Sequence, residues 1–306
     1  MSDREDLRQI IAIRAAVDPI LEPTVEELRF WRERLREPLH VVATIDGDAA
    51  GYGIAGVFPE EEDEANAFAD VGVRPNLRRR GIGSALLGAL SDHVRALGKD
   101  ALQLEVGEEE ADARAFFQRR GYVEIERQKA LELDLGSLEP APAIPEGVEI
   151  ATWAERPDLL LQMYDLYREA SADIPGLDAE TTSSFDEWRL WELERPTRRH
   201  DLSFVAFVAD KVVGYATLNV FPAGGFHGLT AVARAWRRRG VGKALKQSQI
   251  AAAKAAGLEK LFTESEERNA PMRRLNEELG FRPIPGMIVL RGPLVDAGEG
   301  AGISRL

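Results

Sequence analysis

Two short segments of the chain combine arginines and glycines in a pattern suited to binding phosphate. Residues 78–84 read RRRGIGS, and residues 237–243 read RRRGVGK. The first glycine of each can adopt positive φ, which lets the backbone approach a ligand closely. Amides at a helix start and arginine side chains both attract anions, so each segment predicts a pyrophosphate site. The residues expected in the two sites are Arg78, Arg79, Arg80, Gly81, Ile82, Gly83 and Ser84, and Arg237, Arg238, Arg239, Gly240, Val241, Gly242 and Lys243.

Two better-known phosphate motifs do not fit these segments. The dinucleotide fingerprint Gly-x-Gly-x-x-Gly needs a third glycine, which both segments lack. A P-loop needs Ser or Thr after Gly-Lys, but Ala244 follows Gly242-Lys243, and Arg237 stands where the motif needs its first glycine. A basic helix start that binds no ligand is a reasonable interpretation of one such segment. Two copies in the same context favour a ligand site.

The elements around the first segment predict how it is held. Alternating apolar residues predict a strand over 68–73, which enters the segment, and a helix over 82–97 leaves it and ends at Gly98. Helices are expected over 7–17 and 25–36, with Thr24 as the N-cap of the second. The other expected elements are strands 39–45, 51–58 and 101–106, a helix over 112–120 and one or two strands within 122–133. This order predicts a mixed α/β (α+β) fold.

The chain contains an internal repeat. The spacing from Gly81 to Gly240 equals the spacing from Gly121 to Gly280, two glycines in later Gly-aromatic turns. Two domains are therefore expected, over residues 1–135 and 148–295, with a Pro- and Gly-rich linker over 136–147 and a tail over 296–306. The second copy opens with a predicted strand over 148–151. No strand is expected before the first helix of the first copy.

Composition excludes several classes of protein. The net charge of −13 has the wrong sign for a nucleic-acid binder. Neither a secretory signal nor a membrane-spanning run is found, and the chain has no cysteine, so a cytoplasmic location is expected without nucleic-acid or membrane partners. His40, His93 and His200 show no metal-ligand spacing, and no metal is expected.

The two loops carry a resemblance to a known family. The pattern Arg/Gln-x-x-Gly-x-Gly/Ala after a strand resembles the CoA-pyrophosphate loop of the GNAT superfamily of N-acetyltransferases. The resemblance covers nearly the whole chain, once per copy. It implies two tandem domains, each with a central, mostly antiparallel sheet flanked by helices, and acetyl-CoA as cosubstrate. It also implies that the backbones of Val73 and Val232, at the strand ends, bond the pantetheine arm, where an N–H would stabilise the developing oxyanion.

A later motif of the family, Asn-x-x-Ala-x-x-aromatic-Tyr-x-x-x-Gly-Phe, is incomplete in both copies. At the Asn, Ala, aromatic and Tyr positions of this motif, the first copy has Glu110, Ala113, Phe116 and Phe117. The second copy has Asn269, Met272, Leu275 and Asn276. The resemblance implies that Asn269 and Met272 lie along the pantetheine arm. Asn276 stands where the family often has a tyrosine that protonates the departing thiolate. The second copy resembles the C-terminal half of the mycothiol synthase group of this superfamily, which favours it as the catalytic one.

The general base is less clearly marked. His227 lies just before the second loop and has a suitable pKa range, so it is a candidate, although an ordinary turn histidine would look the same. Asp70 and Glu105 are the candidates in the first copy. Phe185, Trp188 and Trp191 follow helical spacing, which indicates packing or an acceptor pocket.

The function predicted from these features is acetylation of an amine by direct transfer from acetyl-CoA. The acceptor is a small molecule or a peptide, and the protein is a monomer or a homodimer. Two alternatives stay open. Because both copies lack the usual tyrosine, the chain can be a non-catalytic acyl-CoA sensor. Because of the resemblance of its second half, it can be an acetyltransferase of the mycothiol-synthase type.

Overall fold

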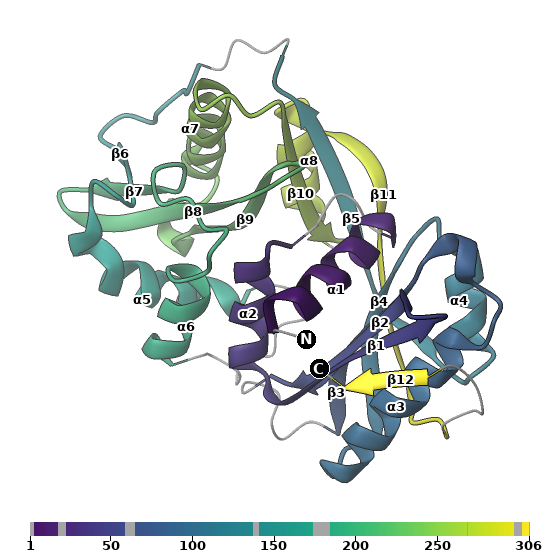
Figure 1. Cartoon of the computed structure of the whole chain (residues 1–306). Coiled ribbons are helices and arrows are strands. Elements are labelled where there is room, and N and C mark those ends of the chain that lie inside the picture. Colours follow the sequence, from purple (N-terminus) through teal and green to yellow (C-terminus); the bar gives the residue numbers. More distant parts are fainter. Residues whose placement is uncertain are drawn as a thin grey trace. The chain divides into compact units, whose positions relative to one another are not determined.

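The computed structural model describes residues 3–17, 23–58, 65–136, 141–173, 184–267, 269–296 and 302–305. The chain forms two compact units, one made of residues 1–127 and 287–306 and the other of residues 128–286. They are called unit 1 and unit 2 below. Each contains a mostly antiparallel sheet with helices on both faces (Figure 1), which confirms the predicted fold class.

Unit 1 is built around a six-stranded sheet of order β12-β1-β2-β3-β4-β11. Only β3 and β4 pair in parallel; the other neighbours are antiparallel. The elements of this half are α1 (Asp3–Val17), α2 (Val25–Arg34), β1 (Arg36–Ile45), β2 (Asp48–Val57), β3 (Asn66–Val73), η2 (Pro75–Leu77), α3 (Ile82–Ala96), β4 (Ala101–Gly107), α4 (Ala111–Gln118), β11 (Arg282–Pro293) and β12 (Gly302–Arg305).

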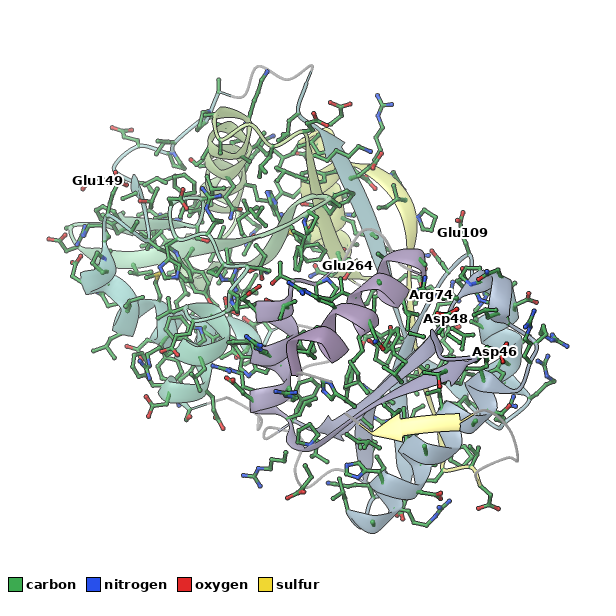
Figure 2. All side chains as sticks on the ribbon, viewed as in Figure 1. Asp46, Asp48, Arg74, Glu109, Glu149 and Glu264 are labelled. Carbon is green, nitrogen blue, oxygen red and sulfur yellow. The ribbon has the colours of Figure 1, made fainter. Side chains whose placement is uncertain are left out.

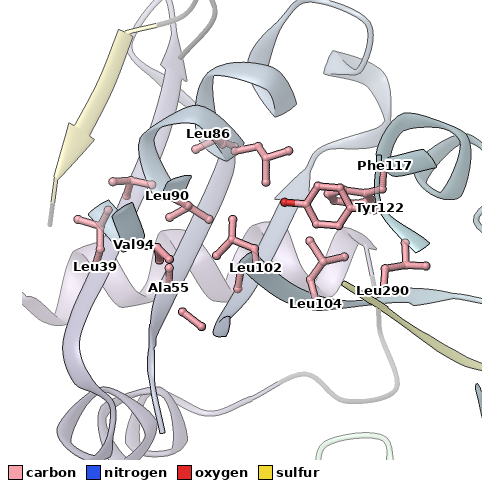
Figure 3. Packing of buried hydrophobic residues seen from close by; sticks show 14 of the residues in the cluster. Leu39, Ala55, Leu86, Leu90, Val94, Leu102, Leu104, Phe117, Tyr122 and Leu290 are labelled. Atoms are coloured by element: carbon pink, nitrogen blue, oxygen red, sulfur yellow. The ribbon is translucent and has the colours of Figure 1, made fainter. Parts of the chain in front are cut away.

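Helices cover both faces of this sheet. On β1, Val41 and Ala43 pack in the α3 cluster, whereas Val42 between them packs in the α1 cluster. Side chains of a strand alternate between faces, so nearly continuous burial indicates cover on both sides. Figure 3 shows the α3 cluster, in which Leu86 and Leu90 of the helix face the strands. Thr24 is the N-cap of α2 as predicted, accepting the Glu27 amide at 3.1 Å.

Unit 2 repeats this plan with the strand order β5-β10-β9-β8-β7-β6. Only β9 and β10 are parallel. Helix α7 packs on one face of β7, β8 and β9, and α5 lies on the other (Figure 1). The elements are β5 (Val123–Asp134), β6 (Glu149–Thr152), η3 (Pro157–Leu159), α5 (Leu160–Ser171), α6 (Phe185–Glu192), β7 (Phe204–Val208), β8 (Lys211–Phe221), β9 (Gly224–Val232), η4 (Arg234–Trp236), α7 (Val241–Ala255), β10 (Lys260–Glu266) and α8 (Ala270–Glu278).

The compact units differ from the sequence repeats at their last strands. Strand β5 closes the first repeat but pairs with β10, where Leu133 faces Leu261 and joins the core of unit 2. Strand β11 closes the second repeat but pairs with β4, where Leu290 faces Leu104 and joins the core of unit 1. The compact units therefore do not follow the boundaries 1–135 and 148–295 predicted from the repeat, because each unit contains most of the last strand of the other repeat.

The predicted tail, residues 296–306, contains a strand. β12 pairs antiparallel with β1, from Val41 opposite Arg305 to Thr44 opposite Gly302. In unit 2 the corresponding place beside β7 is taken by β6, the opening strand of its own repeat. The chain end thus supplies the first strand that the sequence of the first repeat lacks. The two paired strands come from opposite ends of the sequence, so local patterns cannot indicate the pairing.

Most predicted elements of the first copy are found close to their expected ends. Two details differ from the prediction. Helix α2 ends before Arg36, which begins β1 instead, and the closing segment forms a single strand, β5. In the predicted linker, residues 137–140 lie outside the described ranges, and 141–147 contain neither helix nor strand. No helix of the described ranges is long and apolar enough to cross a membrane.

Candidate active site

The two arginine–glycine loops have the same backbone conformation. Gly81 and Gly240 are the N-caps of α3 and α7, with left-handed φ of 82° and 87°. Two residues earlier, Arg79 and Arg238 also have positive φ, 66° and 60°. Positive φ is uncommon for residues other than glycine. Its recurrence at matched positions indicates that both loops are shaped for the same purpose.

Each loop presents a run of free backbone amides. The first helical hydrogen bonds are donated by Ala85 to Gly81, at 3.0 Å, and by Ala244 to Gly240, at 2.9 Å. Within the described ranges, the amides of residues 79–84 and 238–243 donate to no protein acceptor. A Cβ added at Gly81 would meet nothing within 4 Å, whereas one added at Gly240 would lie 3.5 Å from Pro145, an ordinary van der Waals distance. Unbonded amides at a helix start fit a pyrophosphate group.

The first arginine of each loop ties it to the preceding strand. The Nε of Arg78 donates to the Val73 carbonyl at 3.3 Å, and that of Arg237 to the Val232 carbonyl at 3.0 Å. The second partners differ. Arg78 pairs with Glu110 at 3.0 Å, whereas Arg237 pairs with Asp173 at 2.7 Å. Both strand ends predicted to face the ligand are therefore held by their loop.

Asp173, at the end of α5, is a residue that the sequence analysis missed. Its carboxylate accepts two bonds of 2.8 Å from Arg234 as well as the contact from Arg237. The hydrogen bonds from Arg234 and Arg237 lower the pKa of Asp173 to about 2. In unit 1, Arg74 (Figure 2) instead donates its Nε to the Ala49 carbonyl at 2.9 Å. Loop 237–243 is thus attached to α5 by an ion-pair network.

The remaining loop residues divide into anchors and exposed cations. Ile82 and Val241 are buried under their helices, whereas Arg79, Arg80, Arg238 and Arg239 are exposed. At the first helical turn, Ser84 accepts a bond of 2.8 Å from Arg120, and Lys243 pairs with Glu278 at 3.1 Å. A Cβ at Gly83 would lie 3.5 Å from Phe116, and one at Gly242 would lie 3.5 Å from Val232, so both positions have room for a small side chain.

Beside each loop two parallel strands separate. β9 and β10 pair from Gly225 opposite Leu261 to His227 opposite Thr263, although β9 continues to Val232. β3 and β4 stop at Phe68 opposite Gln103. Beyond these pairs, the backbone groups that face the other strand are not used in a ladder. An opening between strands that ends at an anion-binding loop is suited to an extended ligand with a phosphate at one end.

His227 lies inside the core of unit 2. Its pairing with β8 follows a bulge, because Ala216 faces Thr230 and Leu218 faces His227, which leaves one extra residue in β9. His227 is 2% exposed, and its Nδ1 is 2.9 Å from the Nζ of Lys246, which is 1% exposed. Burial, followed by the charge of Lys246, holds the pKa of His227 well below its ordinary value. The histidine is therefore neither at a turn nor open to an acceptor in water.

Lys246 is a second residue that the sequence analysis missed. It is fully buried in α7, and burial lowers the pKa of its amine to about 7. A signal for it was present in the repeat, because the offset that relates Gly240 to Gly81 also matches Lys246 to Leu87. Leu87 is buried in the core of unit 1, so the alignment places a lysine on an inward face.

The two asparagines of the later motif are both close to α8. Asn269 is its N-cap, and its Oδ1 accepts the Met272 amide at 3.3 Å. Asn276 is fully buried, and its main-chain carbonyl accepts a hydrogen bond from the Phe281 amide at 3.1 Å. Within the described ranges, neither polar atom of the Asn276 side chain has a hydrogen-bond partner. Met272 is half-buried on the same helix.

The other candidates are engaged or exposed. Asp70 accepts a bond of 2.7 Å from the hydroxyl of Tyr52 and forms an ion pair with Arg14 of α1. Glu105 is exposed on β4. Trp188 is buried in the cluster that joins α5 and α6 to the sheet, which identifies it as a packing residue. None of these side chains is brought to either loop.

The fold and the paired loops define a tandem protein of the GNAT type. The chain belongs to the Acetyltransferase (GNAT) family, which it matches over residues 7–122 and again over 160–281. This confirms the resemblance inferred from the loops, and it makes the protein an acetyltransferase of that family. Members of the family use acetyl-CoA as the acetyl donor.

Curated relatives and solved structures agree with this assignment. The chain is 27% identical to a mycothiol acetyltransferase of Actinosynnema mirum, over 90% of this chain and 91% of that protein. It is 28% identical to one of Geodermatophilus obscurus, over 79% and 78%. A tandem GNAT protein of the clavulanic acid biosynthesis pathway has a similar fold, with a TM-score of 0.77 at 20% identity over 97% of both chains. A GCN5-related N-acetyltransferase of Sphaerobacter thermophilus gives 0.72 at 21% identity, over 96% of both chains.

Proposed function

We propose that unit 2 transfers the acetyl group of acetyl-CoA to the amine of a small molecule or peptide. One observation carries this proposal: loop 238–243 offers six unbonded amides beside the opening between β9 and β10. The amides and Arg238 and Arg239 would hold the pyrophosphate. Val232 and the strand before it would line the extended arm, with Asn269 and Met272 on the side of α8.

Unit 2 is favoured over unit 1 as the catalytic unit by the charge of one N-cap residue. This residue begins α8 in unit 2 and α4 in unit 1. In unit 2 this position is the neutral N-cap Asn269, whose Oδ1 closes the first turn of α8. In unit 1 it is Glu110, whose carboxylate pairs with Arg78 of the loop at 3.0 Å.

Unit 2 also has a carboxylate at its loop, but Asp173 is shared by two arginines, Arg234 and Arg237, whereas Glu110 pairs with Arg78. The negative charge is therefore more fully offset in unit 2, which favours an anionic ligand there. Unit 1 therefore serves chiefly as architecture or as a weaker binding site.

Bound acetyl-CoA would supply an activated thioester. The residues of unit 2 would bind the pyrophosphate, keep the arm extended along β9 and present free strand amides to the carbonyl as negative charge develops there. Direct transfer within a ternary complex then needs the acceptor nitrogen in its neutral form. Neither His227 nor Asp70 is placed to take a proton from it, so water or the acceptor's own equilibrium fills that role.

The acceptor class is narrowed by the curated relatives. All three of those matched are mycothiol acetyltransferases, at 27%, 28% and 27% identity. We therefore propose a cysteinyl-sugar amine as the second, more specific acceptor candidate. A non-catalytic acyl-CoA sensor is the alternative to both, since Phe117 and Asn276 stand where the family often has tyrosine.

Two measurements test the proposal. Isothermal titration of the full chain with acetyl-CoA is expected to show at least one site. Release of free thiol is then followed with a panel of primary amines that includes aminoglycosides and a cysteinyl sugar. Turnover with any acceptor supports a transferase and excludes a pure sensor. Binding without turnover on the whole panel supports the sensor, and absence of binding refutes both.

A further inference from the structure

The core of unit 2 contains a histidine and a lysine with no acidic partner. His227 and Lys246 are both nearly inaccessible, and they hydrogen-bond to each other at 2.9 Å. Within the described ranges, no carboxylate forms an ion pair with Lys246. Burying an amine away from water without a counter-charge opposes folding. Because this pair destabilises the fold, we expect it to serve a function.

The fold itself does not require polar groups at these places. Leu102 of β4 and Leu261 of β10 are separated by the same number of residues as Gly81 and Gly240. Their partners Ala67 of β3 and Gly225 of β9 are separated by one residue fewer, because β9 contains the extra residue of the bulge. His227 therefore takes the place of Ala69, and Lys246 that of Leu87. Both counterparts are buried in the apolar cluster of unit 1.

The pair lies at the point where β9 and β10 separate. His227 faces Thr263 in the last pair of the parallel ladder, and the opening begins with the next residue. Lys246 follows the first residue of α7 by five positions, about 7.5 Å along the helix at 1.5 Å per residue. The two groups are thus at the closed end of the opening that leads from the anion-binding loop.

Several polar atoms at this point lack a partner. The Nε2 of His227 and both polar atoms of the Asn276 side chain are buried, and within the described ranges none has a hydrogen-bond partner. The Phe281 ring lies 5.5 Å from that of His227 and 5.8 Å from the Nζ of Lys246, and the Phe281 amide donates to the main-chain carbonyl of Asn276. Buried polar atoms usually have a partner, so these three atoms are available to bond with a ligand that enters the opening.

We infer that His227 and Lys246 supply the proton that the sulfur of CoA takes when the acetyl group leaves. The inference rests on the proposed transfer reaction in unit 2. The neutral amine nitrogen forms the new C–N bond and releases one proton to water, and the C–S bond breaks with its electron pair remaining on sulfur. Sulfur takes the proton of His227 Nε2, and His227 Nδ1 takes one from the Lys246 ammonium. Lys246 is left neutral and is reprotonated when CoA departs.

The ionisation of the pair suits this direction of transfer. The ammonium donates to Nδ1, so a neutral His227 carries its own proton on Nε2. Burial lowers the pKa of Lys246 to about 7, while a thiol has an ordinary pKa of about 8.5. The groups opposite His227 on β8 and β10, Leu218 and Thr263, do not titrate, nor does Asn276 of α8. The proton therefore moves from the stronger acid to the stronger base.

Histidine NMR tests the contact without any turnover. The chain has four histidines, so 15N-histidine labelling gives a simple spectrum in which His227→Gln identifies one set of signals. Saturating CoA is expected to shift the Nε2 resonance of His227. Desulfo-CoA keeps the pyrophosphate but lacks the sulfur, and it should leave that resonance in place. Equal spectra with both bound ligands overturn the inference and leave the proposed function standing, whereas failure of both to bind refutes the proposed function.

Kinetics of Lys246→Met test the relay. Loss of a general acid is expected to lower kcat by about 100-fold at pH 7. KM for acetyl-CoA should stay within twofold, and the ionisation near pH 7 in the kcat profile should disappear. Gln249→Met is the matched control, because Gln249 is also fully buried on α7 and bonds only weakly, at 3.5 Å, to the Leu202 carbonyl. A folded Lys246→Met protein with unchanged kcat overturns the inference.

Discussion

The two units share a loop and differ in the core behind it. Both loops have a left-handed glycine as N-cap and a first arginine bound to the strand end. At four matched core positions, however, the side chains change from Ala69, Leu87, Phe117 and Tyr122 in unit 1 to His227, Lys246, Asn276 and Phe281 in unit 2. Anion binding at the loop depends on backbone shape, which duplication preserves. The chemistry at the closed end of the opening depends on side chains, which are free to diverge.

In unit 1, two of the four matched core positions are the aromatic residues Phe117 and Tyr122. Their rings are 5.2 Å apart in the α3 cluster (Figure 3), and burial raises the pKa of the Tyr122 hydroxyl. In unit 2 the matched pair is Phe281 and Asn276, and the Phe281 ring borders the His227–Lys246 contact. The four matched positions are therefore aliphatic or aromatic in unit 1, whereas unit 2 has a histidine, a lysine and an amide at three of them.

The largest expected effect concerns the exchanged strands, which make each unit depend on the other repeat. Leu133→Ala leaves a cavity in the core of unit 2 and Leu290→Ala one in unit 1, and each should cost about 2–5 kcal/mol of stability. Hydrogen exchange followed by mass spectrometry should show faster exchange in β9 and β10 for Leu133→Ala, and in β3 and β4 for Leu290→Ala. If Leu133→Ala instead speeds hydrogen exchange only in β3 and β4, the pairing of β5 with unit 2 is contradicted.

Local elements and both loops were predictable from sequence because their signals are local. A glycine between a strand and an amphipathic helix marks the loop, and Thr24 marks the start of α2. The pairings of β5, β11 and β12 were not predictable, since each depends on a partner strand in the other repeat or at the opposite end of the chain. The bulge that turns His227 inward is a one-residue shift of register, and such a shift reverses which face a side chain occupies.

The second prediction compares the two loops directly. Gly240→Val forces a β-branched residue into the left-handed region at the N-cap of α7, which costs about 1–2 kcal/mol and misdirects the loop amides. With about 1 kcal/mol lost for a displaced hydrogen bond, kcat/KM should fall about 100-fold. Gly81→Val is the matched control in unit 1. It should change kcat/KM less than twofold, and equal losses would contradict the assignment of catalysis to unit 2.

The third prediction concerns the pH dependence of unit 2. The pKa of Lys246 falls from 10.5 to about 7 on folding, so between these values the unfolded chain binds more protons than the folded one. The stability of the wild type should therefore rise with pH in this window, by up to about 1.4 kcal/mol per pH unit. The penalty for burying the charge is fully present below pH 7.

Urea unfolding from pH 7 to 9.5 measures this effect. Tryptophan fluorescence follows mainly unit 2, because Trp31 is the one tryptophan outside it. Lys246→Met should be more stable than the wild type at pH 7, and the difference should shrink as the pH rises. Leu87→Met, at the matched position of unit 1, should show no such trend. A constant difference between Lys246→Met and the wild type would mean that Lys246 is not buried as an ionisable group.

The smallest expected effect tests whether Glu110 weakens the first loop. Glu110→Asn gives unit 1 the residue type of Asn269, removes a carboxylate and releases Arg78 from a contact of 3.0 Å. Both side chains are about one-third exposed, so the ion pair is worth about 0.2–1 kcal/mol, and affinity for CoA in unit 1 should rise by about 1.4- to fivefold. Titration is best done in the Gly240→Val background, where only unit 1 retains an intact loop. An unchanged affinity would show that Glu110 does not oppose CoA binding, and the contrast between the units would then rest chiefly on His227, Lys246 and Asn276.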